Sequence, residues 1–598
     1  MRTCTTLGPA AIGLLAALAT PLHAQVHQTA FTTDDDETEG WRATDAGIGV
    51  NADAVVVTSN MSVSLFARTG GSPLATFQVG DTSNFPFKKF DATYGRLFDP
   101  QVDYDPIDNR LWMIYSEDNT RDPSSAGGGS MARIHMAVSR LENGTIDDFS
   151  SDHWFYFTGN ASASPPTVRD GEPFDLRSTA LLPYQGEPGH TGYIRLADRP
   201  TLAFDERAVI IASWGAFGFP DNANTLTIIP RTHDGATKSI LAGDRPDESD
   251  ITFVRFDGDE LEEDRSTYYM SVQEPFEQFE NKTFFINDPD DISGVSTGIR
   301  LCGLYWDEEL EPDPDWQVRQ KTVGASLDIL LGDAADHYHI SGPNPRTPDS
   351  GWSPPVPEGH IHTAVLVRDA NNDPRIFAAH AVNPDDDGTP VDQLVVQWYV
   401  IDPDLTNFET TSWNPTFDAV GRIDHGDTTG DHYHPVIGVT EQGVAYIEYT
   451  YSDANTWPQV RRVTLNSTYD GIVPNSEVIV KTGPSYAYTG SANAWADFAE
   501  MQADPVTGCS FWSVHTLVHD VADGPTVLDR RDVWLFQSVF NCGNSNLNFD
   551  EGTDLYDMAM FNDLFNAGAR RVDMNTDGTT DATDAILYHD AYDAATGP

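Results

Sequence analysis

The chain has 598 residues, and its 92 Asp and Glu against 35 Lys and Arg give a formal net charge of −57. A charge of this sign repels phosphate backbones, which excludes a nucleic-acid binder that works by phosphate neutralisation. With 39% hydrophobic and 11% aromatic residues, the chain has enough apolar material for a large core or several domains, so a disordered protein is also excluded.

Residues 1–24 have the features of a secretory signal peptide. Arg2 supplies the positive start, Leu7–Leu18 is a short apolar stretch, and Leu22-His23-Ala24 ends on a small residue. The apolar stretch is too short to cross a bilayer, and no later stretch is long and apolar enough to do so. We therefore expect a protein that is secreted, extracellular or associated with the cell surface, without a membrane span.

The mature chain keeps three cysteines, Cys302, Cys509 and Cys542. An odd number leaves at least one thiol free or paired between molecules. Cys509 and Cys542 both lie beside apolar, strand-like runs, and secretion permits a disulfide there. We expect that pair to form a disulfide and Cys302 to be buried and reduced.

The region from about 40 to 541 predicts an all-β fold. Runs of four to eight apolar residues, rich in Val, Ile, Tyr, Phe and Trp, alternate with Gly, Pro, Asn or Asp, and long helical periodicity is absent. Examples of such runs are 54–57, 111–115, 208–213, 394–400, 444–449 and 533–539.

One pattern returns along this region: a polar residue, often Pro, an apolar residue, a spacer, a second apolar residue and commonly Asp. The clearest copies are Asp99-Pro100-x-Val102-x-Tyr104-Asp105, Arg199-Pro200-x-Leu202-x-Phe204-Asp205 and His434-Pro435-x-Ile437-x-Val439. Weaker copies are 362–367 and 498–504, and 48–50 begins another. A degenerate copy fits in the long interval near 250–305.

The spacing of the copies suits units of four short strands. Four-stranded units arranged radially make a β-propeller, which leaves only short, protected sheet edges. We predict a propeller over 25–542 with seven blades, with six as the alternative. A pair of β-sandwiches is the competing fold, but it does not explain the recurring pattern.

Both ends of this region resemble a family of secreted bacterial β-propeller proteins. In that family a W-G-D-Y-S-x-M segment precedes D-P and C-T-F-W. Here the corresponding residues are Trp495-Ala496-Asp497-Phe498-Ala499-Glu500-Met501, then Asp504-Pro505, then Cys509-Ser510-Phe511-Trp512. The segment 49–57 is similar to the family's opening repeat. The resemblance implies a propeller and a disulfide from Cys509 to the chain end, but it implies no single activity.

Residues 573–584 have the spacing of a calcium-binding loop. Oxygen-bearing side chains stand at positions 1, 3, 5, 9 and 12, with Gly578 at the sharp turn. A second copy begins 27 residues earlier at Asn546, with its glycine displaced by one position, so we expect it to bind calcium more weakly. The predicted metal-site residues are Asn546, Asn548, Asp550, Gly552, Asp554 and Asp557 in the first loop, and Asp573, Asn575, Asp577, Thr579, Asp581 and Asp584 in the second.

A short helix is predicted behind each loop, and Phe561 and Phe565 recur as Tyr588 and Tyr592 at the same 27-residue offset. The duplicated loop–helix unit over 543–598 resembles a type I dockerin, a calcium-dependent module that docks into a cohesin on another protein. In that family positions 10 and 11 of each loop often set partner choice. Here these positions hold Leu555-Tyr556 and Ala582-Thr583, which differ, so we expect a single binding orientation.

The repeat pattern also indicates which residues gather at one mouth of the propeller channel. Those segments carry Asp99, Asp198, Arg199, His360, His362, Asp431, His432, His434, Trp495 and Asp497. A mixed His and Asp ring can bind a metal or a polar ligand, and His-x-His spacing places both imidazoles on one side of a strand. Hydrogen bonding between neighbouring blades is the competing role for the same side chains.

Two functions remain open from the sequence. One is a recognition or scaffold propeller, related to polysaccharides or a cell surface and displayed through its dockerin-like module. The other is a tethered, sialidase-like glycoside hydrolase. No intact sialidase Asp-box, G-x-S-x-G, H-E-x-x-H or phosphate-binding loop is present. We therefore favour recognition, with calcium as the cofactor and a cohesin-type protein as the partner.

Overall fold

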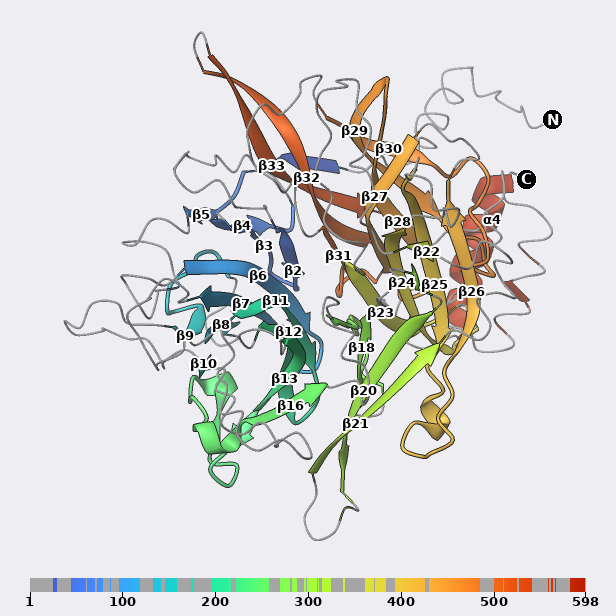
Figure 1. The fold of residues 1–598 in the computed structure, drawn as a ribbon. Coiled ribbons are helices and arrows are strands. Elements are labelled where there is room, and N and C mark those ends of the chain that lie inside the picture. The colour runs from blue at the N-terminus through green and yellow to red at the C-terminus, as the bar shows by residue number, and fades with distance from the viewer. Residues whose placement is uncertain are drawn as a thin grey trace, which may run out of the picture.

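The computed structural model describes residues within 25–28, 45–118, 133–158, 174–175, 196–256, 269–323, 337–338, 361–483, 499–539 and 558–596, with shorter gaps inside several of these ranges. The described strands form seven antiparallel blades, six with four strands and one with a short fifth strand, together with two small two-stranded pairs (Figure 1). The fold is therefore an all-β propeller with seven blades.

The first four blades follow one another along the chain. The first blade contains β2 (Gly47–Val50), β3 (Ala54–Thr58), β4 (Ser62–Ala67) and β5 (Ala75–Gln78). The second contains β6 (Arg96–Asp105), β7 (Arg110–Asp118), β8 (Arg133–Ser139) and β9 (Trp154–Phe157), and β10 (Phe174–Asp175) also pairs with β8. The third contains β11 (Leu196–Phe204), β12 (Ala208–Ala216), β13 (Asn222–Pro230) and β16 (Thr252–Phe256). The fourth contains β17 (Met270–Ser271), β18 (Lys282–Asn287), β20 (Ile299–Asp307) and β21 (Asp315–Val323).

Three further blades complete the ring. The fifth contains β23 (Thr363–Arg368), β24 (Pro374–Val382), β25 (Val395–Asp402) and β26 (Thr416–Ile423). The sixth contains β27 (Gly430–Val439), β28 (Ala445–Asp453), β29 (Thr456–Thr464) and β30 (Val478–Thr482). The seventh contains β31 (Glu500–Ala503), β32 (Ser510–Asp523), β33 (Thr526–Val539) and β1 (Gln25–Gln28).

Short elements lie between these strands. They are the pair β14 (Thr232–His233) and β15 (Lys238–Ser239), the pair β19 (Val295–Ser296) and β22 (His337–Tyr338), and the 3-10 turns η2 (Ile240–Ala242), η3 (Glu248–Asp250) and η5 (Leu405–Asn407). The one α-helix with described bounds is α4 (Ala582–Thr596) at the C-terminal end.

The ring closes at two places. Each inner strand contacts the inner strand of the next blade, in the order β2, β6, β11, β17, β23, β27 and β31, and β31 in turn contacts β2. At the outer edge, β1 pairs antiparallel with β33, so the seventh blade takes its outermost strand from the N-terminal side of the chain (Figure 1). Sharing the last blade between both ends joins the N-terminal side of the chain to its C-terminal blade and so closes the ring.

The predicted seven blades are confirmed, and the six-bladed and double-sandwich alternatives are wrong. The visible copies of the sequence pattern are the inner strands β2, β6, β11, β23, β27 and β31. The degenerate copy expected near 250–305 is β17, which has only two residues in regular pairing and was for that reason hard to recognise.

The Asp that ends the pattern turns the chain from the inner strand into the second strand. Asp105, Asp205 and Asp504 each accept a hydrogen bond from the backbone N–H two residues later, at 3.0, 2.8 and 2.9 Å. The second carboxylate oxygen of Asp105 accepts from Trp112 Nε1, and that of Asp504 accepts from Trp512 Nε1. The recurring Asp is thus a turn residue with a local partner, because an Asx turn satisfies the backbone at the bend.

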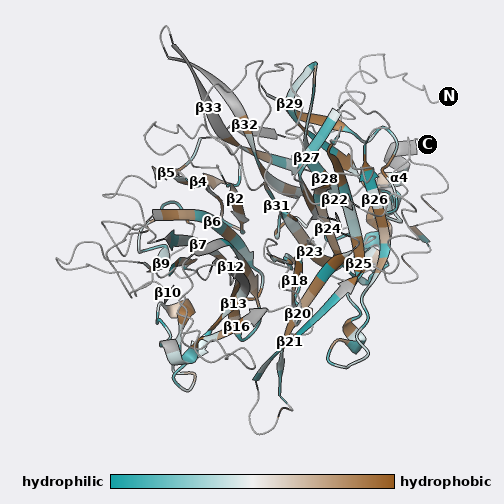
Figure 2. Cartoon of the chain, in the orientation of Figure 1, coloured by the Kyte–Doolittle hydropathy of each residue, from teal (hydrophilic) through white to brown (hydrophobic). Residues whose placement is uncertain are grey.

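Many strands of the blades carry apolar residues (Figure 2), and buried apolar side chains pack between adjacent blades. One buried cluster joins Trp112 of the second blade to Leu202 of the third, and another joins Trp398 of the fifth to Ile437 of the sixth. Each blade is covered on both faces by its neighbours, which is why its strands read as apolar runs with little alternation.

Cys302 is buried in β20 with a free thiol, as expected from the sequence. Burial raises the pKa of this thiol well above its usual range, which keeps it protonated and unreactive. The predicted signal peptide 1–24, Cys509 and Cys542 lie outside the described residues.

The outer strand β1 generates a test of ring closure. We expect a chain that starts at Thr29 to have a melting temperature several degrees below that of a chain that starts at Gln25. The shorter chain loses the register from Gln25↔Gln537 to Gln28↔Trp534 and leaves β33 as an open edge. Differential scanning calorimetry of the two chains measures this, and equal melting temperatures would show that β1 does not close the ring.

Candidate functional site

Three inner strands carry the same β-bulge at an X-Pro step. The register shifts between Phe98 and Gln101 in β6, between Asp198 and Thr201 in β11, and between Tyr433 and Val436 in β27. Proline cannot donate a hydrogen bond to the neighbouring strand, so the ladder breaks there and an extra residue bulges out.

The residue before each of these prolines has a left-handed backbone. The φ angles are 45° at Asp99, 45° at Arg199 and 48° at His434. Positive φ is uncommon for residues other than glycine and stores backbone strain. These three residues were predicted as mouth residues, and the bulge is what gives them their shared position.

Hydrogen bonds link the bulges of the second and third blades to each other and to the first blade. The side-chain amide of Asn60 donates to Asp45, while its oxygen accepts from the backbone N–H of Asp99 at 2.6 Å. Oδ2 of Asp99 accepts from the backbone N–H of Arg199 at 2.9 Å. The carboxylate of Asp99 therefore joins two blades, which is the competing structural role considered for these residues.

The predicted histidines fall into two environments. The rings of His362 and His434 lie edge to face with centroids 5.5 Å apart, across the fifth and sixth blades. The ring of His432 lies instead 5.5 Å from that of Tyr449 and 5.2 Å from that of Tyr451, within its own blade. In a regular strand, His432 and His434 would face the same side and share ring partners. They do not share them, because the bulge begins at His434.

The remaining predicted mouth residues add little to this site. Oδ1 of Asp431 accepts from the backbone N–H of Leu394 at 3.0 Å, within the blade-to-blade structure. The backbone of Asp198 pairs with Trp214. His360, Trp495 and Asp497 lie outside the described residues.

The histidines do not form a ready metal site. Within the described residues, the one group of three ligating side chains whose atoms approach within 4.8 Å of one another is Asp147, Asp148 and His153, ahead of β9. Burial, together with His515, lowers the pKa of His434 to about 3, so this imidazole stays neutral in the folded protein.

The sequence interpretation missed a polar bridge at the centre of the ring. Nε2 of Gln273, which follows β17, donates to Oδ1 of Asp103 in β6 at 2.8 Å and to Oε1 of Glu500 in β31 at 3.1 Å. The bridge therefore joins the second, fourth and seventh blades.

Backbone contacts fix the members of this bridge. The N–H of Gln273 donates to the carbonyl of Ala364, and its own carbonyl accepts from the N–H of Leu366, so the segment continues into the fifth blade. Oε2 of Glu500 accepts from the N–H of Ile48 at 2.7 Å, and the side chain of Gln502 accepts from the N–H of Val50. The first and seventh blades are thereby sealed by side chains of β31.

Both bridged carboxyl groups hold their protons more strongly than usual. Burial and the nearby Glu500 raise the pKa of Asp103 well above its usual range. Burial raises the pKa of Glu500 to about 8. Two buried carboxyls around one amide, without a cation, favour neutral forms.

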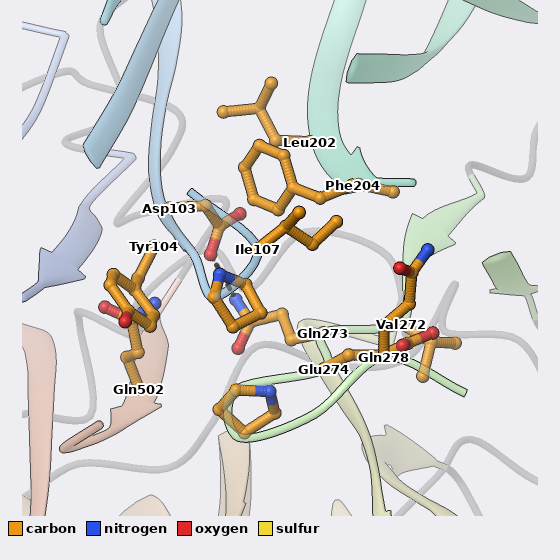
Figure 3. Close-up of a pocket in the computed structure, with 13 residues that line it drawn as sticks. Asp103, Tyr104, Ile107, Leu202, Phe204, Val272, Gln273, Glu274, Gln278 and Gln502 are labelled. Atoms are coloured by element: carbon orange, nitrogen blue, oxygen red, sulfur yellow. Dashed lines mark hydrogen bonds between the residues drawn. The ribbon is translucent and has the colours of Figure 1, made fainter. Parts of the chain in front are cut away.

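A pocket of about 430 Å³, its open mouth included, lies beside this bridge (Figure 3). Asp103, Gln273, Glu274, Gln278 and Gln502 supply its polar wall. Its apolar wall comes from Tyr104, Pro106, Ile107, Leu202, Ala203, Phe204, Val272 and Pro275. The pocket thus combines residues of, or next to, the second, third and fourth inner strands with one residue of the seventh.

A sequence signal for this pocket was present. Asp103, Glu500 and Gln502 are the spacers in the recurring pattern, between the apolar positions that define it. Since side chains alternate along a strand, spacers face the channel when the apolar positions face the blade. The sequence interpretation used the apolar positions and the residues ahead of them, and so passed over the spacers.

Part of the tail is described. Asp581 precedes α4, where its Oδ1 accepts from the N–H of Thr583 at 2.7 Å, and Oδ2 of Asp584 accepts from the N–H of Asp581 at 2.8 Å. This reciprocal pair caps the helix. Ala582 and Thr583 are exposed, whereas Asp584 is buried. The other predicted tail-site residues, Asn546, Asn548, Asp550, Gly552, Asp554, Leu555, Tyr556, Asp557, Asp573, Asn575, Asp577 and Thr579, lie outside the described residues.

The aromatic residues of the two predicted tail helices pack together. The rings of Phe561 and Tyr588 stack with centroids 3.9 Å apart and planes 9° apart, and both side chains are buried. Phe565 and Tyr592 pack against the same cluster. These are the four residues that recur at the 27-residue offset.

Comparisons with known proteins give a fold likeness only. No protein-family model matches the chain, and no curated protein matches it. A protein of unknown function from Dyadobacter fermentans is 10% identical, with a TM-score of 0.33 over 76% of this chain and 97% of that one. An α-L-arabinofuranosidase from Fusarium graminearum is 9% identical, with a TM-score of 0.32 over 75% and 95%. A sialidase from Trypanosoma rangeli is 10% identical, with a TM-score of 0.32 over 69% and 52%.

Glycoside hydrolases are thus among the similar solved structures, but likeness this distant assigns no activity to this chain. No described helix is long and apolar enough to cross a membrane.

His434 generates a prediction for acidic pH. Its unfolded imidazole binds a proton below pH 6.5, whereas the folded one does so only near 3, so protonation favours the unfolded chain between these values. We expect the free energy of unfolding of the native chain to fall, over that range, by up to about 1.4 kcal/mol per pH unit more than that of His434→Asn. Asparagine tolerates the left-handed backbone. Urea titrations between pH 7 and 4 measure both slopes, and parallel slopes would contradict the prediction.

Glu500 generates a prediction of the opposite sign. The unfolded carboxyl loses its proton near pH 4.5 and the folded one near 8, so stability falls as pH rises between them. In the native chain we expect the free energy of unfolding to fall by up to about 1.4 kcal/mol per pH unit over this range, and Glu500→Gln should remove that fall. The amide keeps an oxygen for the Ile48 N–H. Unfolding titrations at pH 5 and pH 8 provide the measurement, and a variant as pH-sensitive as the native chain would refute it.

Proposed function

We propose that this chain is a secreted recognition propeller, displayed on a partner protein through a calcium-dependent docking module. Residues 25–542 are the recognition part, and residues 543–598 are the dockerin-like module. The first described strand begins at Gln25, immediately after the predicted cleavage at Ala24, so the fold is compatible with removal of residues 1–24.

The observation that carries the docking half is the stacked pair Phe561 and Tyr588. Their rings lie 3.9 Å apart and belong to helices that follow the two predicted loops at the same offset. Equivalent residues of a duplicated unit meet at its internal two-fold-like interface. The pairing supports two loop–helix halves that fold against each other.

Calcium would be held by the carboxylate and amide oxygens of the two loops. Asp581 and Asp584 fit this role because a hydrogen bond joins them at the start of α4, where position 12 closes such a loop. The cation would supply the positive charge that lets these side chains converge and would thereby fold the module.

The partner would be a cohesin-type protein. Ala582 and Thr583 are exposed at the first turn of α4, so their side chains are available to a partner, and they differ from Leu555 and Tyr556 at the equivalent positions. This difference supports a single docking orientation.

A hydrolase remains the second candidate, because Asp103 and Glu500 are two buried carboxyls that both accept a hydrogen bond from Gln273, and glycosidases use a pair of carboxyls. However, the amide of Gln273 occupies the space between those oxygens. Glu500 also does not line the pocket. Binding without cleavage is therefore favoured.

Calcium titration of the full chain tests the docking proposal. We expect isothermal calorimetry to show two calcium sites, and Asp584→Asn to lose the tighter one or weaken it at least tenfold, because a charged ligand at position 12 is replaced by a neutral one. Chelation should also lower the helical circular dichroism.

Asp470→Asn is the matched control, since it removes one exposed carboxylate outside the tail. It should leave both calcium sites unchanged. The calcium-module proposal would be wrong if the native chain gave no heat of calcium binding, or if Asp470→Asn lost as much calcium affinity as Asp584→Asn. Release of reducing sugar from a polysaccharide panel would favour the hydrolase.

A further inference from the structure

We propose that the pocket beside the Gln273 bridge binds a neutral, hydroxyl-rich ligand, a saccharide unit, without cleaving it. This inference rests on the recognition half of the proposed function and deepens it by giving it a site and a ligand class. It does not depend on the calcium module.

The polar wall offers hydrogen-bonding groups that the fold leaves available. Oδ1 of Asp103 accepts from Gln273, while its second oxygen makes no hydrogen bond to the described residues. The oxygen of Gln502 accepts from Val50, which leaves its NH₂ group as a donor. Asp103 is 3% exposed and Gln502 is 2% exposed, so both groups are held in the wall with little freedom.

Glu274 adds a third group on the opposite side (Figure 3). Its Oε2 accepts from the N–H of Phe279 at 3.0 Å, whereas its buried Oε1 has no partner among the described residues. A buried polar atom without a partner costs free energy, so a ligand hydroxyl at this point would gain a strong interaction.

The apolar wall suits the carbon face of a sugar ring. Phe204, Leu202 and Ile107 lie together next to Asp103 and above Gln273 and Glu274 in Figure 3, and the ring of Tyr104 lies beside Gln502. Sugars combine such a face with a rim of hydroxyls, and ligand pockets commonly join apolar walls to a few oriented polar groups.

Charge excludes the anionic sugars. No Lys or Arg is among the residues that line the pocket, so its wall offers no cation to pair with a carboxylate or sulfate. Burial raises the pKa of both Asp103 and Glu274 well above the usual range, which favours their protonated, uncharged forms as hydrogen-bonding groups. A sialidase-type substrate would find no cation to pair with in this wall.

Geometry disfavours a metal ion. A calcium ion needs six or more oxygens around one point. The pocket carboxyls do not converge in this way, since the described chain brings three ligating side chains within 4.8 Å of one another only at Asp147, Asp148 and His153.

Calorimetric titration of the full chain with oligosaccharides tests the site. The neutral probes are cellopentaose, xylopentaose, arabinopentaose and galactopentaose, and the anionic probe is trigalacturonic acid. We expect at least one neutral probe to bind and trigalacturonic acid not to bind. Asp103→Asn and Gln502→Glu should each weaken that binding roughly tenfold, since each alters one polar contact and keeps the side-chain volume.

Asp234→Asn is the matched control, because it makes the same change on an exposed turn away from the pocket, and it should bind like the native chain. Binding of no neutral probe, equal binding of trigalacturonic acid, or unchanged affinity in both pocket variants would overturn the site. If calcium binding gave heat that Asp103→Asn abolished, the pocket would be a cation site and not a saccharide site. Each titration is repeated in chelator, so that loss of tail function and loss of sugar binding are read separately, and product analysis shows whether the bound probe is cut.

Discussion

The hydrogen bonds of one amide group hold the centre of this propeller. Gln273 comes from the fourth blade, and its NH₂ group reaches carboxyl oxygens of the second and seventh blades. The two acids would repel each other if both were ionised in this buried place, and the amide lets them lie together as neutral groups. The positions of three blades about the axis, and one wall of the pocket, follow from that arrangement.

The same arrangement bears on the choice between recognition and catalysis as the proposed function. Paired carboxyls act on a glycosidic bond only when the bond can lie between them, and here a protein side chain already lies there. The polar groups that do face the pocket belong to different blades and are anchored by backbone contacts. In the proposed site, such groups would orient a ligand from more than one side. The acidic surface, with its charge of −57, adds a long-range preference against anions.

Much of the fold could be predicted from the sequence, because inner strands repeat a chemical requirement. Apolar positions pack on the blade, and the closing Asp makes the turn, so six of the seven inner strands carry a visible pattern. The remaining inner strand, β17 of the fourth blade, has two paired residues and no such turn. It was indicated only by the long interval between the neighbouring copies of the pattern. Most of the described mouth residues lie on inner strands, and at the X-Pro bulge of β6 the side chain of Asp99 makes a contact between blades.

The pocket could not be predicted in the same way. Its residues meet only after the ring has closed, since Gln273 and Gln502 are far from Asp103 in sequence. The spacer residues between the apolar positions of the pattern cannot be assigned to the pocket until it is known which side of the strand faces the channel. For the tail, duplication at a fixed offset was readable, and the stack of Phe561 on Tyr588 agrees with it. The oxygen-rich loops themselves belong to residues outside the described part, so calcium remains a prediction.

The strand β1 has a consequence for biogenesis. Because Gln25–Gln28 completes a sheet whose other members lie at 500–539, the native ring cannot form until nearly the whole polypeptide has emerged from the ribosome. Until then β1 has no partner strand, a state prone to association with other chains. The pairing of β1 with β33 is therefore a late step that completes the ring.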